Sequence, residues 1–128
     1  MNTNSTIFTV VDSDPFHFFE GGAINSEKVL DVLEFKKADV ASATRLSQKS
    51  VRYDDKMPIE LKQRLREWAV AINLVGQHFQ DIEKTTLWFQ IPNPMLGNMA
   101  PRDMIRVGRF KKLLSFIQTA LAEGAGPT

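Results

Sequence analysis

The sequence predicts an all-α protein with an N-terminal helix-turn-helix unit, one long central helix and a C-terminal helical cap. Three observations favour this fold class. Apolar residues recur at helical spacing after Pro58, and again from Phe110 to Leu121. Prolines and glycines interrupt the chain between these stretches, as they do at helix boundaries. Strand-like composition is confined to one short run, residues 7–11, which could also be an extended arm.

The length suits one domain, or two small helical units that share a core. We expect an N-terminal arm over residues 1–24, the helix-turn-helix unit over 25–68 and a second helical unit over 69–128. The chain has no cysteine, which excludes disulfides, thiolate metal sites and a cysteine nucleophile. It also lacks an apolar run of roughly 20 residues and the features of a signal peptide. We therefore expect a soluble, cytoplasmic protein.

Charge is placed unevenly, although the net charge is only +1. Residues 1–35 carry a net charge of −5, residues 36–66 carry +5 and residues 102–112 carry +4. A basic middle beside an acidic start indicates one face that meets a polyanion. The alternative is a set of mixed charges that only solvates the surface.

The arm contains a group of residues that could in principle bind a metal. They are Asp12, Asp14, His17 and Glu20. Pro15 and the glycines at 21 and 22 favour an ordinary loop instead. We expect the phenylalanines at positions 16, 18 and 19 to pin the arm to the body. A short helix should follow, with Ser26 as its N-cap and its end near Phe35.

Residues 37–54 have the spacing of a helix-turn-helix. The core positions of that motif fall on Val40, Ala41, Leu46 and Val51. Ser47 is expected to cap the second helix, and Arg45 occupies a turn position where glycine is common. The side chains available for base edges or phosphates are then Arg45, Ser47, Gln48, Lys49, Ser50, Arg52 and Tyr53. The alternative is two helices that merely pack together.

A long helix is expected to begin at Pro58. Its apolar stripe has alternating steps of three and four residues and comprises Leu61, Leu65, Trp68, Ile72, Val75 and Phe79. Residues 69–75 are apolar nearly all round, so this helix is either central or part of a dimer contact. Gln80 and Asp81 should end it and cap a short helix from Ile82 to Phe89. His78 is interpreted as a surface or helix-end residue.

Residues 88–101 form a proline-rich corner between two helical patterns. Pro92 and Pro94 bias the preceding residues away from helix, while Gly97 and Asn98 readily take positive φ. Pro101 should open the next helix. The loop has an apolar side made of Trp88, Ile91, Met95 and Leu96. Such a rigid, partly apolar loop is either a plug of the core or a docking surface.

The order of these features resembles the toxin-binding domain of Xre/MbcA/ParS-type antitoxins, which belong to type II toxin–antitoxin systems. The resemblance rests on a helix ending in Trp88-Phe89, then Pro-Asn-Pro-Met-Leu-Gly at 92–97, then the proline at 101. It covers residues 70–124, and residues 36–58 look like the helix-turn-helix half of the same proteins. Asn98 stands where the family usually has a second glycine, and Phe89 where it has leucine.

The resemblance implies an antitoxin that neutralises a toxin encoded by an adjacent gene, commonly a RES-domain toxin that consumes NAD. It also implies a homodimer that binds operator DNA and represses its own operon. The family signature falls on Trp88, Pro92, Asn93, Pro94, Leu96 and Gly97. Position and charge add Arg102, Arg106 and Arg109, or the tail after Leu121, as candidate toxin contacts. The three arginines share one face if a single helix runs through Gly108.

The sequence carries no recognisable catalytic motif. There is no phosphate-binding glycine loop, no His-Glu-x-x-His and no Gly-x-Ser-x-Gly. We therefore predict a protein that is not an enzyme, with no catalytic residues, metal or cofactor. Two alternatives to the antitoxin remain at this point: a transcriptional regulator without a toxin, and a helical adaptor that does not bind DNA.

Overall fold

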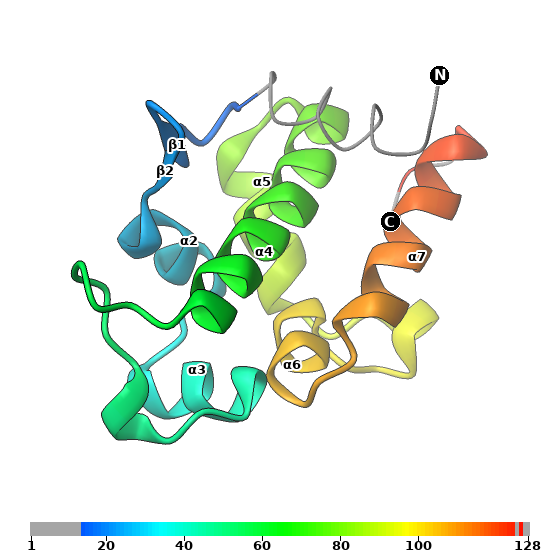
Figure 1. Cartoon of the computed structure of the whole chain (residues 1–128). Helices are drawn as coiled ribbons and strands as arrows, with labels where there is room; N and C mark the ends of the chain where they lie inside the picture. The colour runs from blue at the N-terminus through cyan, green and yellow to red at the C-terminus, as the bar shows by residue number, and fades with distance from the viewer. Residues whose placement is uncertain (1–13, 125, 127–128) are drawn as a thin grey trace.

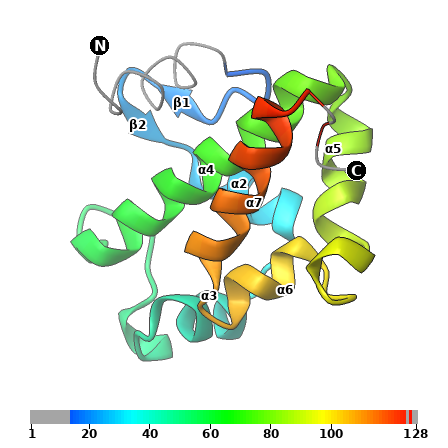
Figure 2. The ribbon, with the colours of Figure 1, turned by 90° about the vertical axis from the view of Figure 1, so that its right-hand side faces the viewer.

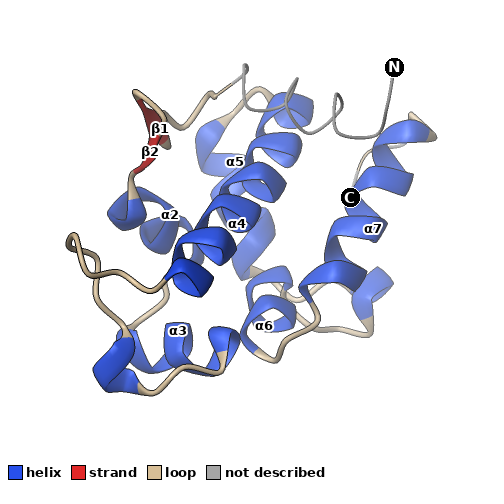
Figure 3. Cartoon of the chain, in the orientation of Figure 1, coloured by secondary structure: helices blue, strands red, loops and turns tan. Residues whose placement is uncertain are grey.

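Helices make up most of residues 14–124 and 126, which are the residues that the computed structural model describes (Figures 1 and 3). The α-helices are α2 (Ser26–Leu33), α3 (Lys37–Thr44), α4 (Ile59–Phe79), α5 (Ile82–Gln90), α6 (Pro101–Arg106) and α7 (Phe110–Ala122). Single 3-10 turns occur at η1 (Gln48–Ser50) and η2 (Pro94–Leu96), and β1 (Phe19–Glu20) pairs with β2 (Ala23–Ile24). The predicted all-α class is confirmed.

Helix α4 lies at the centre of the fold, between α2 and α7, with α5 on a third side and α3 and α6 at one end (Figures 1 and 2). The predicted stripe is buried, apart from Phe79, which is half-buried. From Trp68 to Gly76 only Val70 and Leu74 are not fully buried. The ring of Trp68 meets that of Phe35 edge to face, with centroids 5.6 Å apart. The excess apolar surface of α4 is therefore explained by its central position.

The N-terminal arm is held on α4 by a buried polar contact. Asn73 is fully buried in α4, and its Nδ2 donates to Oδ1 of Asp14 at 3.0 Å. The same carboxylate accepts the backbone N–H groups of Phe18 and Phe19, each at 2.9 Å. Phe16 and Phe18 are buried as predicted, with stacked rings 5.1 Å apart. Asp14 thus folds the arm upon itself and attaches it to the central helix.

A two-residue hairpin follows the arm. Gly21 and Gly22 both have positive φ, as the type I′ turn of a tight hairpin requires. Arg66 of α4 donates to the carbonyl of Gly22 at 2.6 Å and fixes the hairpin tip. Helix α2 is then capped by Asn25, whose Oδ1 accepts Lys28 N–H at 3.1 Å. The expected cap at Ser26 was therefore wrong by one residue.

The predicted second helix of the helix-turn-helix is wrong. Helix α3 is present, and Val40, Ala41 and Val51 are buried at their expected positions. After α3, however, the chain makes only the turn η1 and then becomes extended at Val51. Serines 47 and 50 bond each other at 3.0 Å, and serine competes with helical hydrogen bonding in so short a segment. Arg45 does adopt the positive φ expected of the turn, at 60°.

The three expected chain units stay a prediction. Helix α4 runs continuously through the expected boundary between residues 68 and 69, and one hydrophobic cluster contains residues from Phe16 to Ile117. The expected strand at residues 7–11 and Asp12 of the possible metal group lie outside the described residues. None of the described helices is long and apolar enough to cross a membrane.

Replacing Asp14 or Asn73 by alanine should destabilise the fold, because each change leaves a polar group without its partner. We expect a loss of about 1–3 kcal/mol in the free energy of unfolding for each variant, measured by urea denaturation. The double variant should show a coupling of at least about 0.5 kcal/mol. Asp55→Ala, at an exposed acid, is the control and should change stability by less than about 0.5 kcal/mol. Additive losses in the double variant would contradict the proposed contact.

Candidate functional site

The proline-rich corner is closed by hydrogen bonds that converge on Asn93. Its N–H donates to the carbonyl of Met99 at 3.0 Å, and its carbonyl accepts the N–H groups of Leu96 and Asn98 at 2.9 and 3.0 Å. The Asn93 side chain accepts from Met95 N–H at 2.9 Å. Because this residue is also buried, its polar groups are bonded where water has little access. Residues 93–99 thus form a preformed loop.

The backbone conformations of the corner follow the sequence closely. Ile91 and Asn93, each before a proline, are extended as predicted. Gly97 and Asn98 have φ of 68° and 67°, so asparagine fills the second left-handed position. Pro101 is the first residue of α6. The proline and glycine positions therefore fix where α5 ends and where α6 begins.

Large apolar side chains gather on the outside of this corner. Leu87, Ile91 and Met95 are 47%, 53% and 70% exposed. Leu87 lies in the last turn of α5, Ile91 is the extended residue that follows the helix, and Met95 lies in the turn η2. We call these three residues the corner surface. They are three of the seven large hydrophobic residues that are exposed in the described part of the chain.

The predicted signature residues divide between support and surface. Asn93 is buried, Trp88 and Leu96 are half-buried, and Pro92, Pro94 and Gly97 are exposed. The Trp88 ring packs edge to face on buried Phe89, with centroids 5.0 Å apart. The signature residues therefore determine the shape of the corner. The large exposed apolar side chains belong to residues outside the signature, Leu87, Ile91 and Met95. Leu87 was missed by sequence analysis, although it lies off the buried positions Thr85 and Phe89 of the same helix.

The three candidate arginines do not share one helical face. Helix α6 ends at Arg106, and Gly108 turns the chain with a φ of 88° before α7. Arg102 donates to the carbonyl of Leu33 at 3.3 Å, which satisfies a terminal group of α2. Arg106 pairs with Asp103 at 3.3 Å, while Arg109 is exposed. Arg102 is thus partly structural, and Arg109 is the most accessible of the three.

The candidate nucleic-acid residues lie around η1. Arg45, Ser47, Gln48 and Lys49 are exposed, and Ser50 is half-buried. The guanidinium of Arg52 makes two hydrogen bonds to the carboxylate of Asp54, so this arginine is already paired. Burial raises the pKa of Tyr53. Five of the candidate residues thus lie around η1, while Arg52 is bonded to a neighbouring acid.

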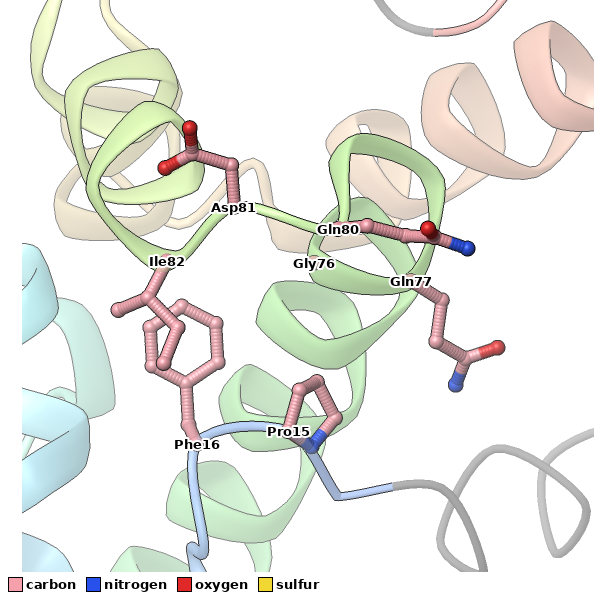
Figure 4. A pocket seen from close by; sticks show the side chains of 7 residues that line it. All are labelled: Pro15, Phe16, Gly76, Gln77, Gln80, Asp81 and Ile82. Atoms are coloured by element: carbon pink, nitrogen blue, oxygen red, sulfur yellow. The ribbon is translucent and has the colours of Figure 1, made fainter.

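The described surface has hollows between its elements. One, of about 540 Å³, lies between the arm and the connection from α4 to α5 (Figure 4). Phe16 and Ile82 line it from opposite segments, and Phe16 packs closely on Gly76. Another hollow, of about 480 Å³, lies between α2, α3 and α6 and includes Arg102 and Arg106. Among the described residues, no group of three histidine or acidic side chains is arranged to hold a metal.

Comparisons with known proteins give one structural likeness. No family model and no curated protein matches the sequence. Among solved structures, the chain is similar to a chain in the crystal structure of the M. tuberculosis MbcT–MbcA toxin–antitoxin complex, with 24% identity and a TM-score of 0.49. The match covers 77% of this chain and 91% of that chain.

The Arg52–Asp54 pair gives a prediction for titration. The hydrogen bond from Arg52, with a further bond from Lys56 N–H, lowers the pKa of the Asp54 carboxyl below its ordinary value of 3.8. The pair therefore stabilises the loop above that pH, and this contribution is lost as the pH falls through the lowered pKa. In Arg52→Ala, carboxyl NMR should show the pKa of Asp54 moving upward. An unchanged Asp54 titration would show that the two side chains are not paired in solution.

Proposed function

We propose that this protein is an antitoxin that neutralises a toxin, encoded by an adjacent gene, through direct contact at the proline-rich corner. The observation that carries the proposal is the exposure of Leu87, Ile91 and Met95, at the end of α5 and on the adjoining loop whose backbone is closed by hydrogen bonds. Exposed apolar side chains on a rigid support are typical of binding surfaces. The Pro-Asn-Pro-Met-Leu-Gly resemblance to antitoxin toxin-binding domains gives the class of partner.

The preformed loop supports this proposal energetically. Binding by a flexible segment is opposed by the entropy of ordering it, and a segment that is already ordered avoids most of that cost. Asn93 orders the loop from within, and Phe89 anchors α5 in the core. The corner surface can therefore contribute its apolar area to binding without first having to fold.

The finer features of the proposal come from the resemblance. The toxin would be of the RES-domain class that consumes NAD, and the antitoxin would act by occluding it as a non-enzymatic protein. The C-terminal helical unit, residues 69–128, would be the toxin-binding part, with Arg106 and Arg109 as polar contacts beside the apolar ones. The homodimer and the cytoplasmic location belong to the same proposal.

Operator binding is the second candidate function. It is favoured by the exposed polar group Arg45, Ser47, Gln48 and Lys49, which projects from α3 and η1. Without a second helix, base contacts would have to come from the turn itself. A clear preference for the promoter of its own operon over a scrambled duplex would be the signature of this function.

Replacing Ile91 or Met95 by aspartate should weaken binding to the product of the adjacent toxin gene at least about tenfold each. An interfacial apolar side chain contributes about 1.5–3 kcal/mol, and a charge in its place would also be desolvated. Affinity would be measured by calorimetry, and growth rescue would be scored on co-expression. Both side chains are mostly exposed, so the free variants should unfold at the wild-type denaturant concentration.

The matched control is Ile59→Asp, a change of the same kind at a residue that is 63% exposed at the start of α4. It should bind the toxin as the wild type does. Folded Ile91→Asp and Met95→Asp variants with wild-type affinity would remove the corner surface from the interface.

A further inference from the structure

Two stretches of the chain contain several cations and no acidic residue. Residues 40–53 include Arg45, Lys49 and Arg52, and residues 104–122 include four further cations. The latter are Arg106, Arg109, Lys111 and Lys112. In a chain with 16 basic and 15 acidic residues, such segregation leaves local positive charge that no neighbour in the sequence offsets.

The fold brings these two stretches together. Helix α3 packs against α6, and Ser42 donates from its Oγ to the carbonyl of Arg106 at 3.3 Å. Arg45 follows three residues after Ser42, and Arg109 three residues after Arg106. Both views of the ribbon show α3 beside α6 at the same end of the molecule (Figures 1 and 2). The end of α3 and the α6–α7 junction therefore share one surface.

Five cations of these stretches are exposed and form no ion pair with an acid of the described residues, in contrast to the paired Arg52 and Arg106. We define the basic junction by these five residues: Arg45, Lys49, Arg109, Lys111 and Lys112. Like charges that lie near one another on a surface repel, and a bound polyanion offsets that repulsion.

The start of α7 also favours a bound anion at the basic junction. The first turn contains Lys111 and Lys112 and no acid, and no side chain caps it. The N-terminal end of a helix carries partial positive charge, so two lysines there are unfavourable and an approaching anion is favoured. The charge pattern of the first turn is thus the reverse of what helix stability alone would select.

We propose that the basic junction binds the phosphate backbone of double-stranded nucleic acid without reading its sequence. Long cationic side chains spread over three chain segments match a line of phosphates, whereas the centre of a protein interface is depleted of charge. This contact needs no recognition helix, and it lies apart from the corner surface, although it shares Arg109 with the proposed toxin contacts. Helix α6 lies between them, with Pro101 on the corner side and Arg106 on the junction side.

The test variant is the double substitution Arg109→Glu and Lys112→Glu. Acids at the start of a helix are favourable, so this variant should fold at least as well as the wild type. The control is Lys62→Glu with Lys84→Glu, two exposed lysines on α4 and α5 whose replacement changes the net charge equally. Binding would be followed by fluorescence anisotropy with a scrambled duplex of about 20 base pairs and with the promoter duplex, over a range of salt.

We expect the junction variant to bind both duplexes at least about tenfold more weakly at low salt, with a shallower salt dependence, while the control keeps the wild-type salt dependence. Three results would overturn the proposal. They are an equal loss in the control, a loss confined to the promoter duplex, and tighter binding of the wild type to polyglutamate than to DNA. The last result would assign the junction to an acidic protein.

Discussion

The fold is organised by residues 68–76 of α4, which are buried on nearly all of the helix circumference. A helical segment that is apolar on every side must be covered on every side, and here α2, α5, α7 and the N-terminal arm each cover a part. Asn73 is the polar exception, and it serves to attach the arm through Asp14. The close approach of the Phe16 ring to Gly76 explains why this helix contains a glycine near its end. The central helix thus decides where its neighbours lie.

The packing around α4 also determines the position of the corner. Helix α4 ends at Gln80 in the left-handed conformation, and Asp81 immediately caps α5. Phe89 is anchored in the core, and Gln90 donates to the carbonyl of Val32 at 3.0 Å. The end of α5 is therefore fixed on both sides before the prolines begin. A loop held in this way can present apolar side chains to solvent without collapsing onto the core.

Much of the fold could be predicted because its signals are local. The stripe of α4, the capping by Asp81 and the backbone of the corner follow from spacing and from the conformational limits of proline and glycine. Arg45 takes positive φ at the turn position where glycine is common. The exposed site residues were predicted in part, since Ile91 and Met95 belong to the apolar side expected for the corner, whereas Leu87 was not expected.

The remaining features depend on contacts between distant residues, which spacing does not reveal. The Asp14–Asn73 contact joins residues far apart in the chain, and Arg102 turns inward only because the end of α2 lies beside it. The prediction of a second helix was wrong because the motif positions indicate which residues are buried, not whether a serine-rich segment stays helical. The basic junction likewise exists only once α3 has packed on α6.

The corner is closed by its own hydrogen bonds before any partner binds. Amide hydrogen exchange of the free protein reports on this closure, because the N–H groups of Asn93, Leu96 and Asn98 are all bonded within the loop. These amides should exchange as slowly as those in the last turn of α6. Exchange at the rate of an unstructured peptide, with protection appearing only on addition of the toxin, would show that the corner folds on binding and would contradict this account.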